Sequence, residues 1–182
     1  DGAVKSTVEI NDSTTNGPSL TNDVRFGRSI ANIGDLNSDG VNDLAVGAYW
    51  DSIGTRKGTV HIMFMNTDGT VDSTVEINDS TTNGPELANG FWFGTSVENI
   101  GDLDGNGVND LAVGAILDSS GGDSRGATNI IFMDEEGDGA VKSTVEINDV
   151  TTNGPQLANN DRFGFSIANI GDLDGDGVND LA

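Results

Sequence analysis

One segment of this chain is written three times, at 26–45, 93–112 and 163–182. Each copy opens with Phe-Gly, continues through an apolar run into an acidic, glycine-rich loop, and ends in Asn-Asp-Leu-Ala. The run Ser-Thr-Val-Glu-Ile-Asn-Asp recurs with the same spacing, starting at residues 6, 73 and 143. Self-similarity at one fixed period predicts a modular fold, in which each unit packs on its neighbours.

Each unit contains four short runs that are typical of β-strands. In the first unit they cover residues 27–33, 44–48, 59–65 and 74–77. Apolar and polar residues alternate in the third run, and Gly, Asn, Asp and Pro separate the runs. No helical period accompanies them. Four antiparallel strands per repeat of this length predict an all-β chain of β-propeller blades.

The repeat markers divide the chain into about 2.7 units. Residues 1–25 are expected to hold the outer strand, at 7–10, and the connection of an incomplete first blade. Residues 26–92 and 93–162 form two full repeats, and 163–182 begin a third. Two or three blades do not close a ring. We therefore expect either a piece of a larger propeller or chains that complete one another as a head-to-tail homo-oligomer.

The acidic loops place oxygen-bearing groups at positions 1, 3, 5, 7 and 9, where position 7 offers its backbone carbonyl. Calcium takes six to eight such oxygens, and a glycine at position 6 permits the tight curl that brings them together. We therefore predict up to three Ca²⁺ ions, one per loop. The ligands are Asp35, Asn37, Asp39, Val41 and Asp43 in the first loop, Asp102, Asp104, Asn106, Val108 and Asp110 in the second, and Asp172, Asp174, Asp176, Val178 and Asp180 in the third.

Competing assignments of these loops fit less well. An EF-hand needs a glutamate at position 12, where this chain has Val46 and Val113, and it needs flanking helices. Asx turns alone do not require several carboxylates that repel one another. Magnesium prefers octahedral geometry with retained waters, and zinc and copper prefer softer ligands. Other calcium-loop solenoids stay open as an alternative. By charge count, the third loop should bind most tightly.

Charge excludes several classes of partner. The chain has 30 acidic and 8 basic residues, a formal charge of -22, so it offers no basic surface for nucleic acid or an anionic membrane. No apolar run approaches the length needed for membrane insertion. The chain has no cysteine and one histidine, His61. Because the acidic loops account for most of the notable aspartates, we expect no enzymatic activity.

Phe-Gly, the acidic loop and Asp-Leu-Ala-Val-Gly-Ala together resemble the FG-GAP repeat of integrin α-subunit propellers and their microbial relatives. The resemblance implies a β-propeller with calcium in the loop between the first two strands of a blade. The family's Gly-Ala-Pro ending is absent, because Tyr49 and Ile116 follow Gly-Ala here. It also implies that the opposite end of the blades carries partner contacts, for which Tyr49, Trp50 and Trp92 are candidates; covering a blade seam is the competing role of these rings.

The expected function is a calcium-binding module at the cell surface or outside the cell, used for protein interaction, adhesion or scaffolding. Two alternatives stay open. A carbohydrate-binding propeller would stack sugars on Trp50 and Trp92. An accessory propeller would serve a larger secreted enzyme. The partner, a protein or a glycan, is not specified by the sequence.

Overall fold

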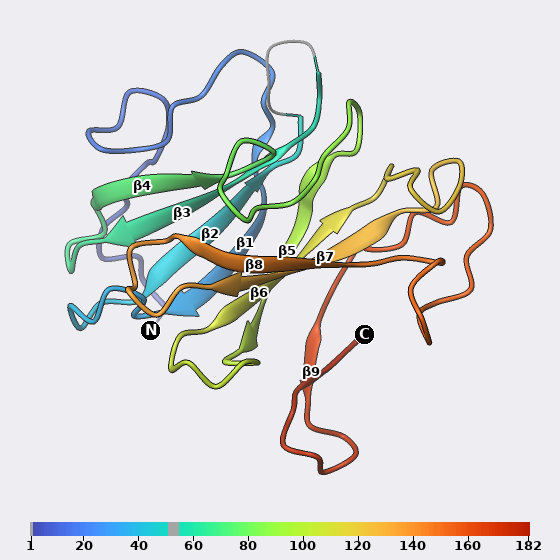
Figure 1. Ribbon diagram of the computed structural model, residues 1–182. Helices are drawn as coiled ribbons and strands as arrows, with labels where there is room; N and C mark the ends of the chain where they lie inside the picture. The colour runs from blue at the N-terminus through green and yellow to red at the C-terminus, as the bar shows by residue number, and fades with distance from the viewer. Residues whose placement is uncertain (1, 51–54) are drawn as a thin grey trace.

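The computed structural model describes residues 2–50 and 55–182, and the regular structure of these residues is all β (Figure 1). Residues 51–54, in the expected surface loop between the second and third strands, and Asp1, in the first expected unit, lie outside the described residues. The strands are β1 (Phe26–Gly34), β2 (Asp43–Ala48), β3 (Thr59–Met65), β4 (Val71–Ile77), β5 (Phe93–Gly101), β6 (Asp110–Ala115), β7 (Ala127–Met133), β8 (Val141–Ile147), β9 (Asn169–Gly171) and β10 (Asp180–Leu181).

Two four-stranded antiparallel sheets form the body of the molecule. Their strand orders are β1-β2-β3-β4 and β5-β6-β7-β8, so each sheet is a simple meander. β9 and β10 pair as a short third sheet. Figure 1 shows the sheets side by side without closure into a ring. The predicted all-β architecture of four-stranded blades is therefore confirmed.

The main core lies between the two four-stranded sheets. Phe93 at the start of β5 is fully buried there, among Ile62 and Val60 of β3 and Leu111 of β6. A second cluster covers the other face of the first sheet, where Ile10 from the N-terminal segment packs against buried Val46 and Met63. Both faces of the first sheet are thus covered. For this reason every residue of β3 is buried, although its sequence alternates between apolar and polar residues.

At the Phe-Gly end, the backbones of neighbouring blades come into direct contact. The Phe93 N–H donates to the Lys57 carbonyl at 2.8 Å, and Ser29 Oγ donates to the Gly94 carbonyl at 3.1 Å. A Cβ atom added at Gly47 would lie 2.0 Å from the Gly94 oxygen. The next seam repeats this close approach, since a Cβ atom added at Gly114 would lie 1.9 Å from the Gly164 oxygen. The Gly of Gly-Ala is therefore required by the Phe-Gly of the next unit.

At the other end, asparagine side chains connect the blades. Each asparagine amide donates to a backbone carbonyl of the preceding blade, at 2.9 to 3.1 Å. The pairs are Asn99 with Asn32, Asn109 with Ile33, Asn169 with Asn99, and Asn179 with Ile100. A Cβ at Gly34 would lie 2.9 Å from the Asn109 amide nitrogen. Gly34, which ends β1, therefore leaves room for the Asn109 side chain of the next blade. We call these asparagine–carbonyl hydrogen bonds between blades the asparagine clamps.

Two expected strands differ most from the structure, and β4 begins at Val71, three residues before the expected 74–77. Residues 7–10, expected as an outer strand, have no regular structure, because no third strand of that blade lies beside them in the described chain. The segment is instead anchored through Asn16, whose carbonyl accepts from Thr74 Oγ1 at 2.9 Å. In the third unit, β9 has 3 residues where β1 and β5 have 9, because its partner β10 has only 2.

Replacing Gly47 with alanine should destabilise the protein by about 3 kcal/mol, because the new methyl group would collide with backbone that cannot swing away. Urea unfolding at fixed calcium concentration measures the change. Ser73→Ala, on an exposed residue of β4, is the control and should change the free energy of unfolding by less than about 0.5 kcal/mol. Equal stability of the two variants would contradict the close approach at the seam.

Candidate metal centres

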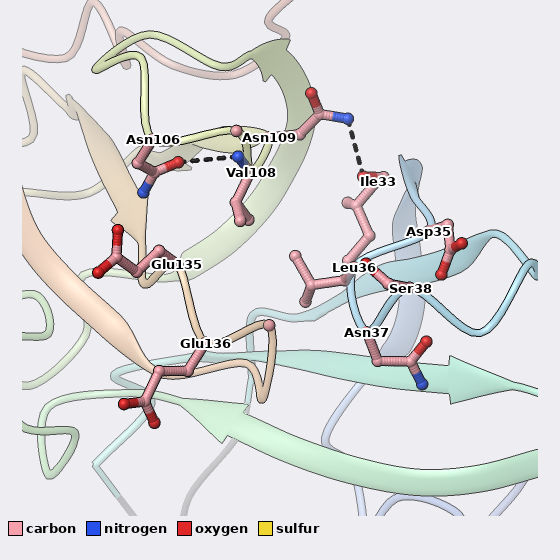
Figure 2. A pocket seen from close by; sticks show the side chains of 12 residues that line it. Ile33, Asp35, Leu36, Asn37, Ser38, Asn106, Val108, Asn109, Glu135 and Glu136 are labelled. Carbon is pink, nitrogen blue, oxygen red and sulfur yellow. Dashed lines mark hydrogen bonds between the residues drawn. The ribbon is translucent and has the colours of Figure 1, made fainter.

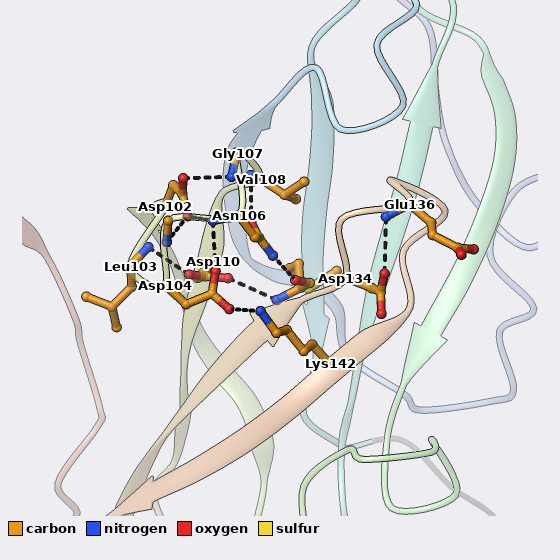
Figure 3. A network of polar contacts seen from close by, with 12 residues as sticks. Asp102, Leu103, Asp104, Asn106, Gly107, Val108, Asp110, Asp134, Glu136 and Lys142 are labelled. Atoms are coloured by element: carbon orange, nitrogen blue, oxygen red, sulfur yellow. Dashed lines mark hydrogen bonds and ion pairs between the residues drawn. The ribbon is translucent and has the colours of Figure 1, made fainter.

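The aspartate at position 1 shapes each acidic loop from within. In the β5–β6 loop, Asp102 Oδ1 accepts from the N–H groups of Gly105 and Asn106, at 2.8 and 3.0 Å. Its Oδ2 accepts from the Gly107 N–H at 2.8 Å (Figure 3). Gly107 has a φ of 91°, a backbone conformation that favours glycine. The Asp102 carboxylate therefore stabilises the tight turn by accepting hydrogen bonds from three backbone N–H groups of the same loop.

The other two loops repeat this arrangement. In the β1–β2 loop, Asp35 Oδ2 accepts from the Gly40 N–H at 2.8 Å, and in the β9–β10 loop Asp172 Oδ2 accepts from the Gly177 N–H at 2.9 Å. The identical hydrogen bonds arise from the identical spacing of aspartate and glycine in the three copies.

The aspartate at position 9 ties the loop to the sheet. Asp110 is fully buried, and its two oxygens accept from the backbone N–H groups of Leu103 and Met133, at 2.8 and 2.9 Å. Asp43 makes the same two bonds to the first blade's equivalent residues. Burial raises the pKa of Asp43 and Asp110 above the usual aspartate value, and the backbone donors partly offset this effect.

The carboxylates converge in two of the three loops. Oxygens of Asp102, Asp104 and Asp110 lie within 4.8 Å of one another, and so do those of Asp172, Asp174 and Asp176 in the third loop. Asp180, at position 9 of the third loop, accepts a hydrogen bond from the Leu173 N–H of the same loop at 2.8 Å.

The first loop differs because position 3 is an asparagine. The Asn37 amide nitrogen donates to Asp39 Oδ2 at 3.1 Å, so a neutral side chain sits where the second loop has a carboxylate. The first loop's three aspartates, Asp35, Asp39 and Asp43, do not converge as a group in the described residues.

The remaining predicted ligands occupy defined places. The N–H of Val108 donates to Asn106 Oδ1, and that of Val178 donates to Asp176 Oδ1, both at 2.8 Å. The Val41 N–H donates to Asp39 Oδ1 at the same distance. Val41 and Val108 also pack their side chains against the hydrophobic clusters. The role of the three valine carbonyls as ligands stays a prediction.

The donor set of these loops suits a hard divalent cation. The side chains offer carboxylate and amide oxygens and no sulfur or imidazole, which is the chemistry that calcium prefers over zinc or copper. In the second loop the nearest positive group is Lys142 of β8, whose Nζ lies 2.6 Å from Asp104 Oδ2 (Figure 3). The hydrogen bond to Asp104 raises the pKa of Lys142.

The first two loops face each other across a crevice between the blades, shown in Figure 2. Asp35 and Asn37 line one side, Asn106 and Asn109 line the other, and the β7–β8 turn contributes Glu136. The acidic loops therefore share their end of the molecule with a third-to-fourth-strand connection, as expected from the meander. The Asn109 clamp to Ile33 bridges this crevice at 3.0 Å.

The three aromatic residues predicted for the opposite end lie together at the seam between the first two blades. The ring centroids of Tyr49 and Trp50 lie 5.4 and 5.2 Å from that of Trp92. Two arginines, Arg25 and Arg56, place their guanidinium groups 5.4 and 4.2 Å from the Trp50 ring centroid. The three half-buried rings thus lie at the seam between the blades, and the two exposed arginines border them.

A buried carboxyl group outside the loops was not predicted from the sequence. Asp118, in the β6–β7 connection, is 1% exposed; its Oδ1 accepts from the Ser120 N–H at 2.7 Å. Its Oδ2 has no hydrogen-bond partner among the described residues. Burial raises the pKa of Asp118, and burial together with the charge of Asp118 raises the pKa of Glu146 on β8.

Residues 26–63, which hold the first acidic loop, match the FG-GAP repeat family, so the chain contains an FG-GAP repeat. The chain is similar to integrin α subunits. It is 38% identical to integrin α-PS5 of Drosophila melanogaster over 96 residues, which are 53% of the chain and 9% of that protein. It is 45% identical to integrin α-5 of Xenopus laevis over 99 residues, covering 50% and 8%.

The similarity to integrin α-6 of Gallus gallus covers more of the chain, with 33% identity over 159 residues, 86% of the chain and 13% of that protein. The chain thus spans about a tenth of the length of these relatives. Nowhere in residues 2–50 and 55–182 is there a helix with the length and apolar character needed to cross a membrane.

Replacing Asp118 with asparagine should change the pH dependence of stability. A folded-state pKa raised above the unfolded value of about 3.8 means that stability is lost as pH rises from the unfolded pKa through the folded pKa. The asparagine of Asp118→Asn stays neutral, so the variant should gain stability relative to the parent as pH rises from about 4 towards 7. Urea unfolding across this range, at fixed saturating calcium, measures the difference. Asp12→Asn, which alters an exposed carboxylate, is the control; parallel profiles for Asp118→Asn and the parent would contradict this prediction.

Proposed function

We propose that this integrin-like propeller module binds calcium in its three acidic loops and serves adhesion-type interactions outside the cell or at the cell surface. The observation that carries the proposal is the convergence of Asp102, Asp104 and Asp110 in the loop that also clamps the preceding blade through Asn109. The similarity to integrin α subunits supports an adhesion role, and the acidic, cysteine-free composition is compatible with it.

The full set of predicted ligands fits the proposed ion. In the second loop Asp102, Asp104, Asn106 and Asp110 would hold it with their side chains, and Val108 with its carbonyl. Bound calcium supplies positive charge that offsets the repulsion among these carboxylates. The chain's own groups connect this loop to its surroundings, because Asp110 fixes it to β7 through Met133 and Asn109 fixes it to the first blade through Ile33. Order in the loop therefore favours order at the seam.

The aromatic cluster is our candidate for the partner contact. Trp, Tyr and Arg are the residue types most enriched at energetic hot spots of protein interfaces, and Tyr49, Trp50, Trp92, Arg25 and Arg56 combine all three. A protein partner is favoured over a sugar, because Arg56 already lies over the Trp50 ring and the rings lean against one another. Carbohydrate binding is the second candidate, and a glycan-array signal lost in Trp50→Ala would favour it.

An enzymatic role is not proposed, because the acidic loops account for most of the clustered aspartates. Service as an accessory propeller in a larger secreted enzyme stays an alternative that the neighbouring gene sequence would test. Head-to-tail association also stays a prediction. Sedimentation velocity with and without a chelator tests it, since assemblies held by calcium-ordered blades would dissociate on chelation, whereas a monomer under both conditions would contradict it.

Calcium should raise the thermal stability of the protein, and a chelator should reverse the effect. At about one hundred times the dissociation constant, each occupied site adds roughly 2.7 kcal/mol, or about 5–10 °C in a chain of this size. The double variant Asp102→Asn/Asp104→Asn should lose the part of this calcium-dependent stabilisation that the second loop contributes. Differential scanning calorimetry across a calcium series measures this.

The matched control is Asp23→Asn, which removes an exposed carboxylate outside the loops. It should keep the whole calcium-dependent shift. If the double loop variant also kept the whole shift, the second loop would not be a calcium site.

A further inference from the structure

A lysine occupies one edge of the second acidic loop. Lys142 Nζ lies 2.6 Å from Asp104 Oδ2, and Asp104 is one of the three carboxylates that converge there. Figure 3 shows the side chain extending from β8 towards the loop. Among the described residues, no other lysine or arginine forms an ion pair with a predicted ligand of the three loops.

The first blade carries the opposite charge at the equivalent place. In both blades the outer strand pairs with the third strand through a matching irregularity, Met65 with Val71 in one and Met133 with Val141 in the other. The next residue is Asp72 in β4 and Lys142 in β8. Both loops contain three aspartates among their predicted side-chain ligands, so this outer-strand residue is one difference in charge beside them; the acidic β7–β8 turn, with Glu135 and Glu136, is another.

We propose that Lys142 is a built-in counter-cation of the second loop, which lowers the calcium affinity of that loop and holds Asp104 in place when the ion is absent. This inference rests on the proposed calcium function. A positive charge this close to a ligand oxygen repels a divalent ion and competes for the same oxygen. Asp72 in the first blade adds attraction instead. The second site therefore responds at higher calcium concentrations than it would without the lysine.

The ion pair also lies beside the contacts that join the blades. Asp110 of the same carboxylate group accepts from Met133, and the neighbouring Asn109 donates to Ile33 of the first blade. With Lys142 paired to Asp104, part of the negative charge in this loop is balanced without metal. The contacts that join the second loop to the first blade therefore depend less on calcium than the loop sequence alone implies.

The loops can be observed separately by nuclear magnetic resonance during a calcium titration. The backbone amides of Gly40, Gly107 and Gly177 each donate to the first aspartate of their own loop, so each reports one site. In Lys142→Gln, the midpoint for Gly107 should fall about three- to tenfold in calcium concentration, whereas the other two midpoints stay unchanged. In Asp72→Lys, the midpoint for Gly40 should rise by a similar factor.

Lys5→Gln is the matched control, because residues 3–7 and 140–144 have the same sequence and Lys5 has no ion pair with a described acidic loop. It should move no midpoint. If the glycines respond to calcium but neither Lys142→Gln nor Asp72→Lys shifts its own loop, the proposal on Lys142 is overturned and the calcium function stands. If no glycine responds to calcium in the parent protein, the calcium function itself fails.

Discussion

The fold of each blade depends on one buried aspartate at the end of its acidic loop. Asp43 and Asp110 are fully buried, where an unpaired charge would be severely destabilising. Each is tolerated because both of its oxygens accept from backbone N–H groups, one in its own loop and one at the end of the third strand. A single side chain thus joins the first hairpin of the blade to the next strand, and it also contributes negative charge to the loop.

The seams transmit this order to the next blade at two separate points. At the Phe-Gly end, Gly47 and Gly94 allow direct contact of two backbones. At the loop end, Asn99 and Asn109 reach across to carbonyl groups of β1. Burial of Phe93, next to Gly94, and of the apolar core between the sheets adds hydrophobic stabilisation to these polar contacts. Blade packing and loop geometry are therefore parts of the same set of interactions.

Much of this arrangement could be predicted from the sequence, because the signals are local and repeated. The third strand of the first unit was expected at 59–65, the bounds that β3 has, and spacing alone grouped Asp102, Asp104 and Asp110. The asparagine clamps could not be predicted, since Asn109 and Ile33 are far apart in the chain and the Asn-Asp pair suggested only a loop end. The repeated asparagine at position 8 was the available signal.

Some features depended on contacts between strands that periodicity does not describe. His61 alternates with apolar residues, yet it is buried because both faces of the sheet are covered. Lys142 approaches Asp104 only because β8 follows β7 past the loop. The segment at 7–10 has the sequence of an outer strand, but a strand forms only where a neighbour offers a ladder of hydrogen bonds.

The acceptors of the asparagine clamps are main-chain carbonyl groups, and the close approach at the other end involves glycine on both sides. The asparagine contacts need only a backbone carbonyl with a glycine beside it, and the close approach needs the glycine of Gly-Ala, which both full repeats supply. One copy can therefore follow another without compensating substitutions at the interface, so recombination between copies could lengthen or shorten the array by whole units. The similar sequences of the three copies are what such a history of duplication would leave behind.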